Sequence, residues 1–122
     1  MTVRYVILTH DHPHLHWDLM LEEVSSLRTW RLAQEPLGET PIKAEPLPAH
    51  RKHYLDYEGP VSGDRGTVTQ WDAGDYLLEI DREEEIWVSL SGKRLRGRAI
   101  LKRDPDTEFW TFQLTESEDS DS

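Results

Sequence analysis

The sequence predicts a mainly β protein, in the form of a small closed or nearly closed β-barrel of short antiparallel strands with long loops and little helix. Short runs of β-branched, aromatic and aliphatic residues recur about every ten residues, with turn-forming residues between them. No segment repeats its apolar residues at helical spacing over a useful length. The 122 residues are enough for one compact core but not for two.

Eight segments have the composition of strands. They span residues 3–9, 14–21, 27–33, 67–71, 76–80, 86–90, 95–102 and 110–114. Residues 72–74 and residues 91–92 are turn sequences, which predict two hairpins. Residues 34–49 contain four prolines and a glycine, which predicts a long loop. Residues 50–59 mix aromatic and polar side chains and favour neither helix nor strand.

The second predicted strand has a period of two. One face carries His14, His16, Asp18 and Met20, and the other face carries Leu15, Trp17, Leu19 and Leu21. This alternation is typical of a half-buried strand, so we expect an apolar back and a functional front.

A candidate metal site lies on that front. His16 and Asp18 are two residues apart, so their side chains leave the same face of the strand. His10 ends the preceding strand, and a turn can fold it back towards them. Two imidazoles and a carboxylate form a facial ligand set with open positions, which suits Mn²⁺, Fe²⁺ or Zn²⁺. Two plainer interpretations stay open: histidines that face solvent, or a histidine-rich turn that binds metal without purpose. His12 and His14 fit the second.

His50 and Tyr54 form a second candidate site. A histidine can protonate a leaving group or hold a phosphate oxygen near neutral pH, and a tyrosine hydroxyl can orient either partner. The alternative is a loop histidine beside a core tyrosine. Asp56 and Glu58, in the run YLDYEG, are either hydrogen-bond partners of the histidines or turn residues before Gly59.

The net charge of −10 argues against non-specific nucleic-acid binding, because phosphates attract Lys and Arg. Residues 115–122 hold four acids and no base. We therefore expect a single domain over residues 1–114 and a disordered acidic tail over residues 115–122. Arg94, Arg96 and Arg98 alternate along one predicted strand, which favours a solvated outer face over a phosphate-tracking stripe.

The sequence contains no apolar stretch long enough to span a membrane, no signal-peptide pattern and no cysteine. Disulfides and thiolate metal ligands are therefore excluded. These features predict a cytoplasmic protein without membrane partners, and a monomer is favoured.

Six runs of sequence carry a resemblance to a known family. They are HDHPHLHWDLMLE, LRTWRL, HRKHYLDYEGPV, RGTVTQWDAGDY, SLSGKRLRGRAILKR and FWTFQL. In this order, and over residues 5–114, they resemble the 3′-phosphoesterase domain of bacterial DNA ligase D. His10, His16 and Asp18 match the two histidines and the aspartate of the family's first motif.

The resemblance implies a Mn²⁺-dependent hydrolase on a small β-barrel, with Zn²⁺ or Co²⁺ as alternative metals. The implied reaction belongs to DNA repair: a 3′ ribonucleotide and then a 3′ phosphate are removed to leave a 3′ hydroxyl. Nucleic-acid 3′ ends and DNA-repair proteins are the implied partners. By the same resemblance, His10, His16 and Asp18 are metal ligands. His50, with Tyr54 beside it, contacts the scissile phosphate or transfers a proton.

The sequence departs from the family pattern in its positive charges. Met20 stands where the family has an arginine, and a Gln-Glu pair after the Trp strand replaces a Lys-Gly pair. Arg28, Arg31 and Lys43 are candidates to supply the missing charge, and Arg65, in a glycine-bearing turn, is a weaker candidate for a phosphate contact.

Two other functions stay open. One is a barrel that binds metal and a nucleic-acid end or a partner protein without catalysis, which Met20 favours. The other is a metal-dependent phosphatase or phosphodiesterase for small molecules, because the net charge of −10 weakens the case for DNA as the substrate.

Overall fold

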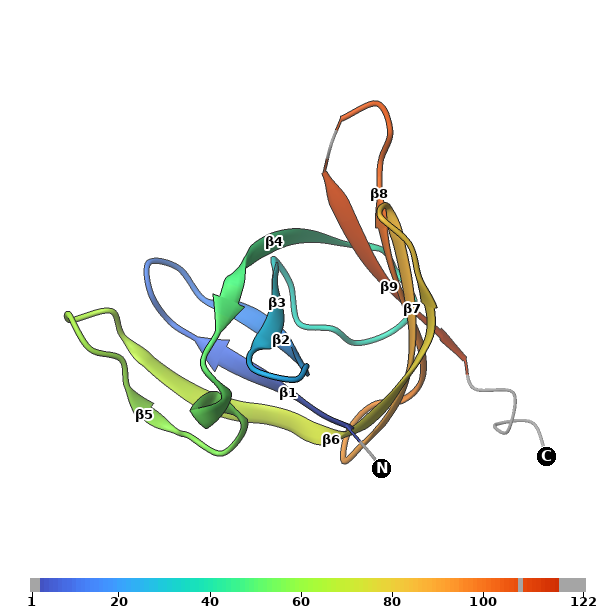
Figure 1. The fold of residues 1–122 in the computed structure, drawn as a ribbon. Helices are drawn as coiled ribbons and strands as arrows, with labels where there is room; N and C mark the ends of the chain where they lie inside the picture. The colour runs from blue at the N-terminus through green and yellow to red at the C-terminus, as the bar shows by residue number, and fades with distance from the viewer. Residues whose placement is uncertain (1–2, 108, 117–122) are drawn as a thin grey trace.

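The computed structural model describes residues 3–107 and 109–116, most of which lie in one sheet (Figure 1). The strands are β1 (Val3–His10), β2 (His16–Glu22), β3 (Leu27–Leu32), β4 (Ile42–His50), β5 (Gly59–Pro60), β6 (Thr67–Asp81), β7 (Glu85–Gly92), β8 (Arg96–Arg103) and β9 (Trp110–Glu116). A 3-10 helix, η1 (Lys52–Leu55), lies between β4 and β5. Within the described ranges, no helix is long and apolar enough to cross a membrane.

The sheet closes on itself, because β1 pairs with β2 on one side and with β6 on the other. The strand order is β1-β2-β3-β4-β9-β8-β7-β6, with β5 added beside β6. Neighbouring strands are antiparallel throughout. Figure 1 shows β5 and η1 outside the ring, on the side of β6. This arrangement confirms the predicted mainly β fold, a closed sheet of antiparallel strands with little helix.

The inside of the ring is an apolar core to which all eight ring strands contribute. Alternate residues of each strand face inward, as the period of two requires. Tyr5 and Ile7 come from β1, Leu19 from β2, Trp30 from β3 and Phe112 from β9, and all five are at most 2% exposed. Burial of these large side chains is the main favourable contribution to folding.

A second apolar cluster lies on the outer face of β1, β2 and β3. Val6 and Leu8 alternate with the inward-facing residues of β1, and Met20 does the same on β2. Leu55 of η1 packs on this cluster and covers it. His10, His16 and Asp18 lie on the same outer face, so the second cluster packs beside the predicted metal site.

The predicted front and back of β2 are only partly correct. β2 begins at His16, because its pairing with β1 ends where His16 lies opposite His10. Leu15 therefore belongs to the preceding connection and is 58% exposed, which contradicts its place on an apolar back. Leu19 faces the core as expected, but Met20 on the front is also buried, at 1% exposure.

The predicted loop over residues 34–49 is wrong in its second half, where β4 forms. The pairing of β4 with β9 ends at Ala44, whereas its pairing with β3 continues beyond that residue. Pro46 and Pro48 therefore lie where, among the described residues, only one side of β4 has a neighbouring strand. A proline is tolerated at such an open edge because no ladder bond needs its N–H.

The hairpin predicted at residues 72–74 is absent, because β6 continues through this segment from Thr67 to Asp81. Gly74 lies opposite Gly92 of β7. A Cβ at Gly74 would come within 2.1 Å of the Ser91 carbonyl oxygen. The glycine therefore permits a close approach of two strands and does not form a turn.

The remaining strand predictions are confirmed. β7 and β8 form the second predicted hairpin, with their connection at residues 93–95. The unassigned residues 50–59 contain η1. β9 extends to Glu116, beyond the predicted start of the acidic tail, and residues 117–122 of that tail lie outside the described residues.

Candidate active site

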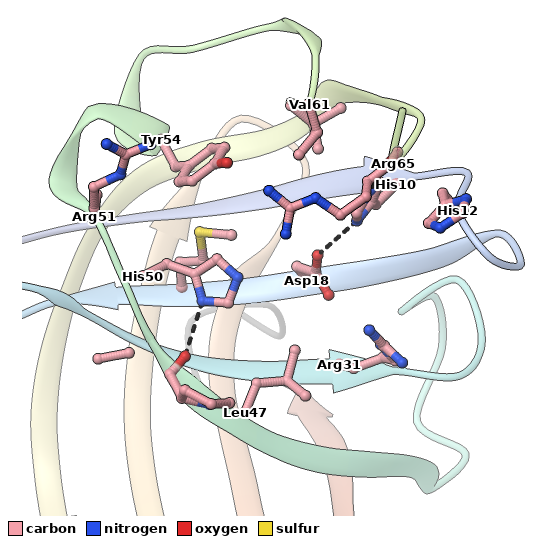
Figure 2. A pocket seen from close by; sticks show the side chains of 14 residues that line it. His10, His12, Asp18, Arg31, Leu47, His50, Arg51, Tyr54, Val61 and Arg65 are labelled. Atoms are coloured by element: carbon pink, nitrogen blue, oxygen red, sulfur yellow. Dashed lines mark hydrogen bonds and ion pairs between the residues drawn. The ribbon is translucent and has the colours of Figure 1, made fainter. Parts of the chain in front are cut away.

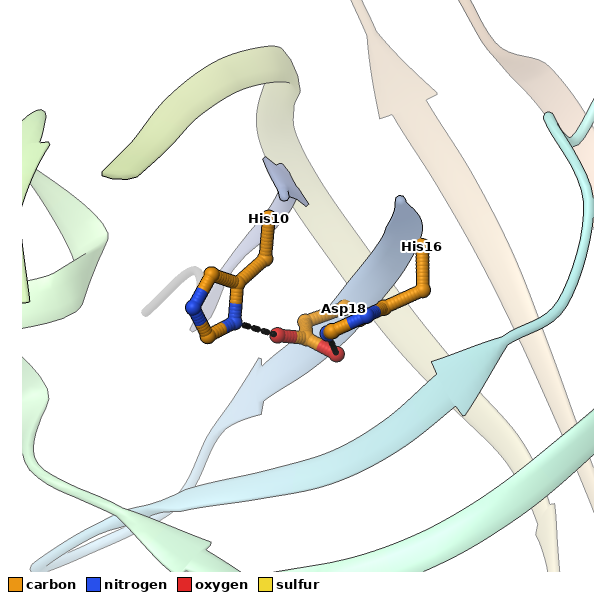
Figure 3. Close-up of side chains that lie close together, drawn as sticks. All are labelled: His10, His16 and Asp18. Carbon is orange, nitrogen blue, oxygen red and sulfur yellow. Dashed lines mark ion pairs between the residues drawn. The ribbon is translucent and has the colours of Figure 1, made fainter. Parts of the chain in front are cut away.

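The three predicted metal ligands meet at one end of the β1–β2 pair (Figure 3). His10 and His16 lie opposite each other in the pairing, and Asp18 follows two residues later on the same face. His10 Nδ1 is 3.6 Å from Asp18 Oδ2, and His16 Nε2 is 3.3 Å from Asp18 Oδ1. One ligand atom from each residue lies within 4.8 Å of the other two. The antiparallel register therefore assembles the trio.

Main-chain carbonyls orient both histidine rings. His10 Nε2 lies 2.7 Å from the Arg65 carbonyl oxygen, and His16 Nδ1 lies 2.8 Å from the His14 carbonyl oxygen. A carbonyl can only accept a hydrogen bond, so each of these ring nitrogens carries the proton. The other nitrogen of each neutral ring then presents a lone pair towards Asp18. Fixed tautomers of this kind are typical of histidines that bind metal.

The trio fits a divalent transition metal. His16 Nε2 and Asp18 Oδ1 are buried, and neither has a hydrogen-bond partner in the part of the chain that the structure describes. A neutral imidazole nitrogen and a carboxylate oxygen are both acceptors, so a bound cation would satisfy them together. Ligands about 2.1 Å from a metal lie roughly 3.0–3.4 Å from their neighbours, close to the two distances found here. The N, N, O donor set suits Mn²⁺, Fe²⁺ or Zn²⁺.

A cavity of about 460 Å³ opens beside the trio (Figure 2). His10 and Asp18 line it together with His50 and Tyr54, while His16 lies buried behind. The structure thus brings both predicted sites to one place. His14 does not line the cavity.

His50 is oriented in the same way as the two histidines of the trio. Its Nδ1 lies 2.9 Å from the Pro48 carbonyl oxygen and donates to it, so Nε2 is the nitrogen that can act on a ligand. The Tyr54 ring packs edge-on at a centroid distance of 5.8 Å and limits rotation of the imidazole. In the view of Figure 2, the Tyr54 ring lies above the His50 ring.

Three arginines also line the cavity: Arg31 of β3, Arg51 after β4 and Arg65 before β6. Nothing in the sequence marks Arg51 except its place next to His50. His12, which fits a bystander by sequence, lines the cavity as well. The side chains of these residues converge from four different segments, which no local pattern could indicate.

Asp56 and Glu58 act as structural residues and do not support the histidines. Asp56 binds the Arg4 guanidinium at 2.6 Å, and this hydrogen bond lowers the pKa of the Asp56 carboxyl. Glu58 accepts a hydrogen bond from the Gln70 backbone N–H at 2.6 Å. Their interpretation as partners of the histidines is therefore wrong.

The alternating arginines at positions 94, 96 and 98, for which the sequence favours a solvated outer face, lie away from the cavity. Arg98 pairs with Glu79 at 2.8 Å, and the Arg94 guanidinium lies over the Trp71 ring. Among the described residues, neither these two arginines nor Arg96 line the cavity.

Comparison with known proteins supports the resemblance found in the sequence. The family model of the DNA Ligase D 3′-phosphoesterase domain matches residues 8–103. The chain therefore belongs to the family of DNA ligase D 3′-phosphoesterase domains. It is 30% identical over 111 residues to the multifunctional non-homologous end joining protein LigD of Pseudomonas aeruginosa. The match covers 83% of this chain and 13% of that relative, so the chain spans only a small part of the relative's length.

Proposed function

We propose that this protein is a metal-dependent phosphoesterase that processes the 3′ ends of nucleic acid in DNA repair, by removing a 3′ ribonucleotide or a 3′ phosphate. The observation that carries the proposal is a single cavity lined by His10 and Asp18 of the metal-compatible trio, by the oriented His50 and by three arginines. Membership of the 3′-phosphoesterase family and the name of the end-joining relative support the choice of substrate.

The metal ligands and His50 would have different roles in the reaction. His10, His16 and Asp18 would hold the metal, with Mn²⁺ as the first choice. A bound metal would supply Lewis-acid polarisation of a phosphate oxygen and would offset the negative charge that develops on the phosphoryl oxygens. His50 is the proposed general acid. Its Nδ1 is committed to the Pro48 carbonyl oxygen, so the protonated ring would donate from Nε2 to the leaving oxygen as water attacks phosphorus and the P–O bond to that oxygen breaks.

The first experiment is cleavage of an end-labelled DNA primer that ends in one ribonucleotide, with a matched primer that ends in a 3′ phosphate. Reactions contain Mn²⁺ or EDTA and use the wild-type protein, His16→Ala, His50→Ala and His14→Ala. We expect Mn²⁺-dependent trimming that His16→Ala abolishes and His50→Ala slows by about 10²- to 10⁴-fold. His14 is exposed and outside the cavity, so His14→Ala is the matched control.

The outcomes separate the candidate functions. No product from either primer, with Mn²⁺ binding demonstrated by calorimetry, would contradict the enzyme and favour a protein that only binds. Turnover of p-nitrophenyl phosphate without turnover of either primer would instead favour a small-molecule phosphoesterase.

A further inference from the structure

The positive charge of the cavity comes from arginines that differ in how they are held. Arg65 donates from Nε to the Ser62 carbonyl oxygen at 2.7 Å and from Nη2 to the Ser62 hydroxyl at 3.2 Å, so its own turn fixes it. Arg51 is exposed at the rim. Arg31 is the least exposed of the three and lies one residue before the end of β3.

Arg31 lies next to the metal trio. In the antiparallel pairing of β2 with β3, Arg31 is directly opposite Asp18, so both side chains leave the same outer face. In Figure 2, Asp18 lies between Arg65 and Arg31 in the view. An anion bound beside Asp18 would therefore lie within reach of the Arg31 guanidinium.

The other two cations considered from the sequence point elsewhere. Arg28 faces away from the cavity, with its guanidinium over the Trp30 ring and 3.3 Å from Asp81. Lys43 places its ammonium over the Phe109 ring. Of these three candidates, only Arg31 lines the cavity.

The hydrogen-bonding capacity of Arg31 is largely unused. Its Nε is buried and has no acceptor among the described residues. Its Nη1 is 3.9 Å from Glu45 Oε1, longer than the roughly 2.7–3.2 Å of an N–H···O hydrogen bond. A guanidinium presents five N–H donors in a plane, and a phosphate accepts two of them side by side. A small rotation towards the cavity would let a phosphate satisfy the guanidinium.

The neighbouring wall of the cavity cannot supply this charge. Met20 is the next residue after Asp18 on the outer face of β2, and it is 1% exposed in the apolar cluster with Val6 and Leu8. A buried thioether cannot neutralise a phosphate oxygen. Among the described residues of β2 and β3 that line the cavity, Arg31 is the one cation.

We infer that Arg31 is a phosphate-binding residue of this cavity, which donates to the phosphate oxygens that do not face the His10–His16–Asp18 trio. The inference rests on the proposed function in taking a phosphate group as the ligand. Arg31 would be an additional phosphate contact of the site, and it lies on β3, outside the motif that contains His10, His16 and Asp18.

The test combines equilibrium binding with kinetics. Binding of inorganic phosphate to the Mn²⁺-loaded protein is measured by calorimetry, and KM and kcat are measured with the 3′-phosphate primer. We expect Arg31→Ala to weaken phosphate binding about 10- to 100-fold and to raise KM, because a charge-assisted bidentate contact is lost. Arg31→Lys should recover part of the affinity, and Mn²⁺ binding should be unchanged. Arg28→Ala, on the same strand, is the matched control.

Glu45→Gln separates ligand binding from a structural ion pair. If Arg31 only pairs with Glu45, this variant should behave like Arg31→Ala; we expect phosphate binding at least as tight as in the wild type. Wild-type phosphate affinity in Arg31→Ala, an equal loss in Arg28→Ala, a parallel loss of Mn²⁺ affinity, or no phosphate binding by the wild type would each overturn the inference. Arg31-dependent phosphate binding without turnover would contradict only the proposed function, and turnover that ignores Arg31 would contradict only the inference.

Discussion

Among single residues, three histidines are oriented in the same way, by a hydrogen bond to the main chain. His10, His16 and His50 each donate one ring N–H to a main-chain carbonyl, and each keeps its second nitrogen for the site. The carbonyls belong to Arg65, to His14 and to Pro48, so the backbone sets the tautomers. The orientation of these rings therefore depends on the path of the main chain.

The trio should dominate metal binding. We expect His16→Ala and Asp18→Asn to weaken Mn²⁺ binding by more than about 100-fold. Loss of a group that only hydrogen-bonds to a metal ligand typically weakens metal binding by about 10- to 100-fold, which is less. Calorimetry with Mn²⁺ gives the affinities, and circular dichroism checks the fold. His14→Ala should bind Mn²⁺ like the wild type, because it retains the carbonyl that orients His16. Unchanged affinity in both ligand variants would rule out the trio as the metal site.

At the scale of elements, the turn before β6 connects the fold to the site. Asp11, after β1, accepts a hydrogen bond from the Thr67 backbone N–H at 2.8 Å. Gly66 lies between Thr67 and Arg65, whose carbonyl orients His10. The turn thus sets the position of a metal ligand.

Gly66→Ala should disturb the site from this turn. Gly66 has a φ of +80°, and a Cβ there would come within 2.3 Å of Asp11 Oδ1 and 2.7 Å of His12 Cβ. We expect the turn to shift and His10 to lose the hydrogen bond that orients its ring. Mn²⁺ affinity should then fall about 10- to 100-fold, as is typical when a group that hydrogen-bonds to a metal ligand is lost. Calorimetry on the purified variant measures this loss.

Gly38→Ala is the matched control for that change. Gly38 also has a positive φ, +74°, but nothing lies within 4 Å of a Cβ placed there. Both substitutions strain the backbone by about 1–2 kcal/mol, but only the one at Gly66 touches the site. Equal Mn²⁺ affinities of the two variants would contradict a role for the turn in positioning His10.

At the scale of the whole molecule, a buried contact joins the closing strands of the ring. The Tyr5 hydroxyl of β1 donates to Asp72 of β6 at 2.5 Å. Asp72 also accepts the backbone N–H groups of Arg94 and Leu95, in the β7–β8 connection, at 2.8 and 3.2 Å. A Cβ at Gly92 would come within 1.9 Å of the Tyr5 hydroxyl, so glycine is needed there.

This contact predicts a loss of stability at alkaline pH. Burial, and then the hydrogen bond to Asp72, raise the pKa of Tyr5 well above its ordinary value of 10.0. The folded protein therefore keeps the Tyr5 proton at a pH where the unfolded chain loses it. The stabilisation is complete below pH 10 and decreases as the pH rises above it.

Urea unfolding of the wild type and of Tyr5→Phe between pH 7 and 11 checks this prediction. At pH 7, Tyr5→Phe should reduce the free energy of unfolding by about 1–3 kcal/mol, because a hydrogen bond to a charged acceptor is lost. Above pH 10, its stability should fall less steeply than that of the wild type. Parallel curves above pH 10 would show that Tyr5 does not titrate on unfolding.

Short-range spacing in the sequence was enough to identify the site residues that lie close together in the chain. The period of two placed His16 and Asp18 on one face, and His10 at the end of the adjoining strand completed the trio. The mainly β class followed from the same short-range alternation. Strand pairing within a hairpin links residues that are close in the chain, so spacing alone carries this information.

The way in which distant segments meet became visible in the folded protein and could not be read from the sequence. The tertiary structure made β4 from a proline-rich stretch and a continuous β6 from an apparent hairpin, because the neighbours of a strand determine where proline and glycine are tolerated. It also placed Arg31 opposite Asp18 and His50 across the cavity from both. Such contacts depend on strand register and ring closure, which are properties of the whole sheet and leave no periodic pattern in the sequence.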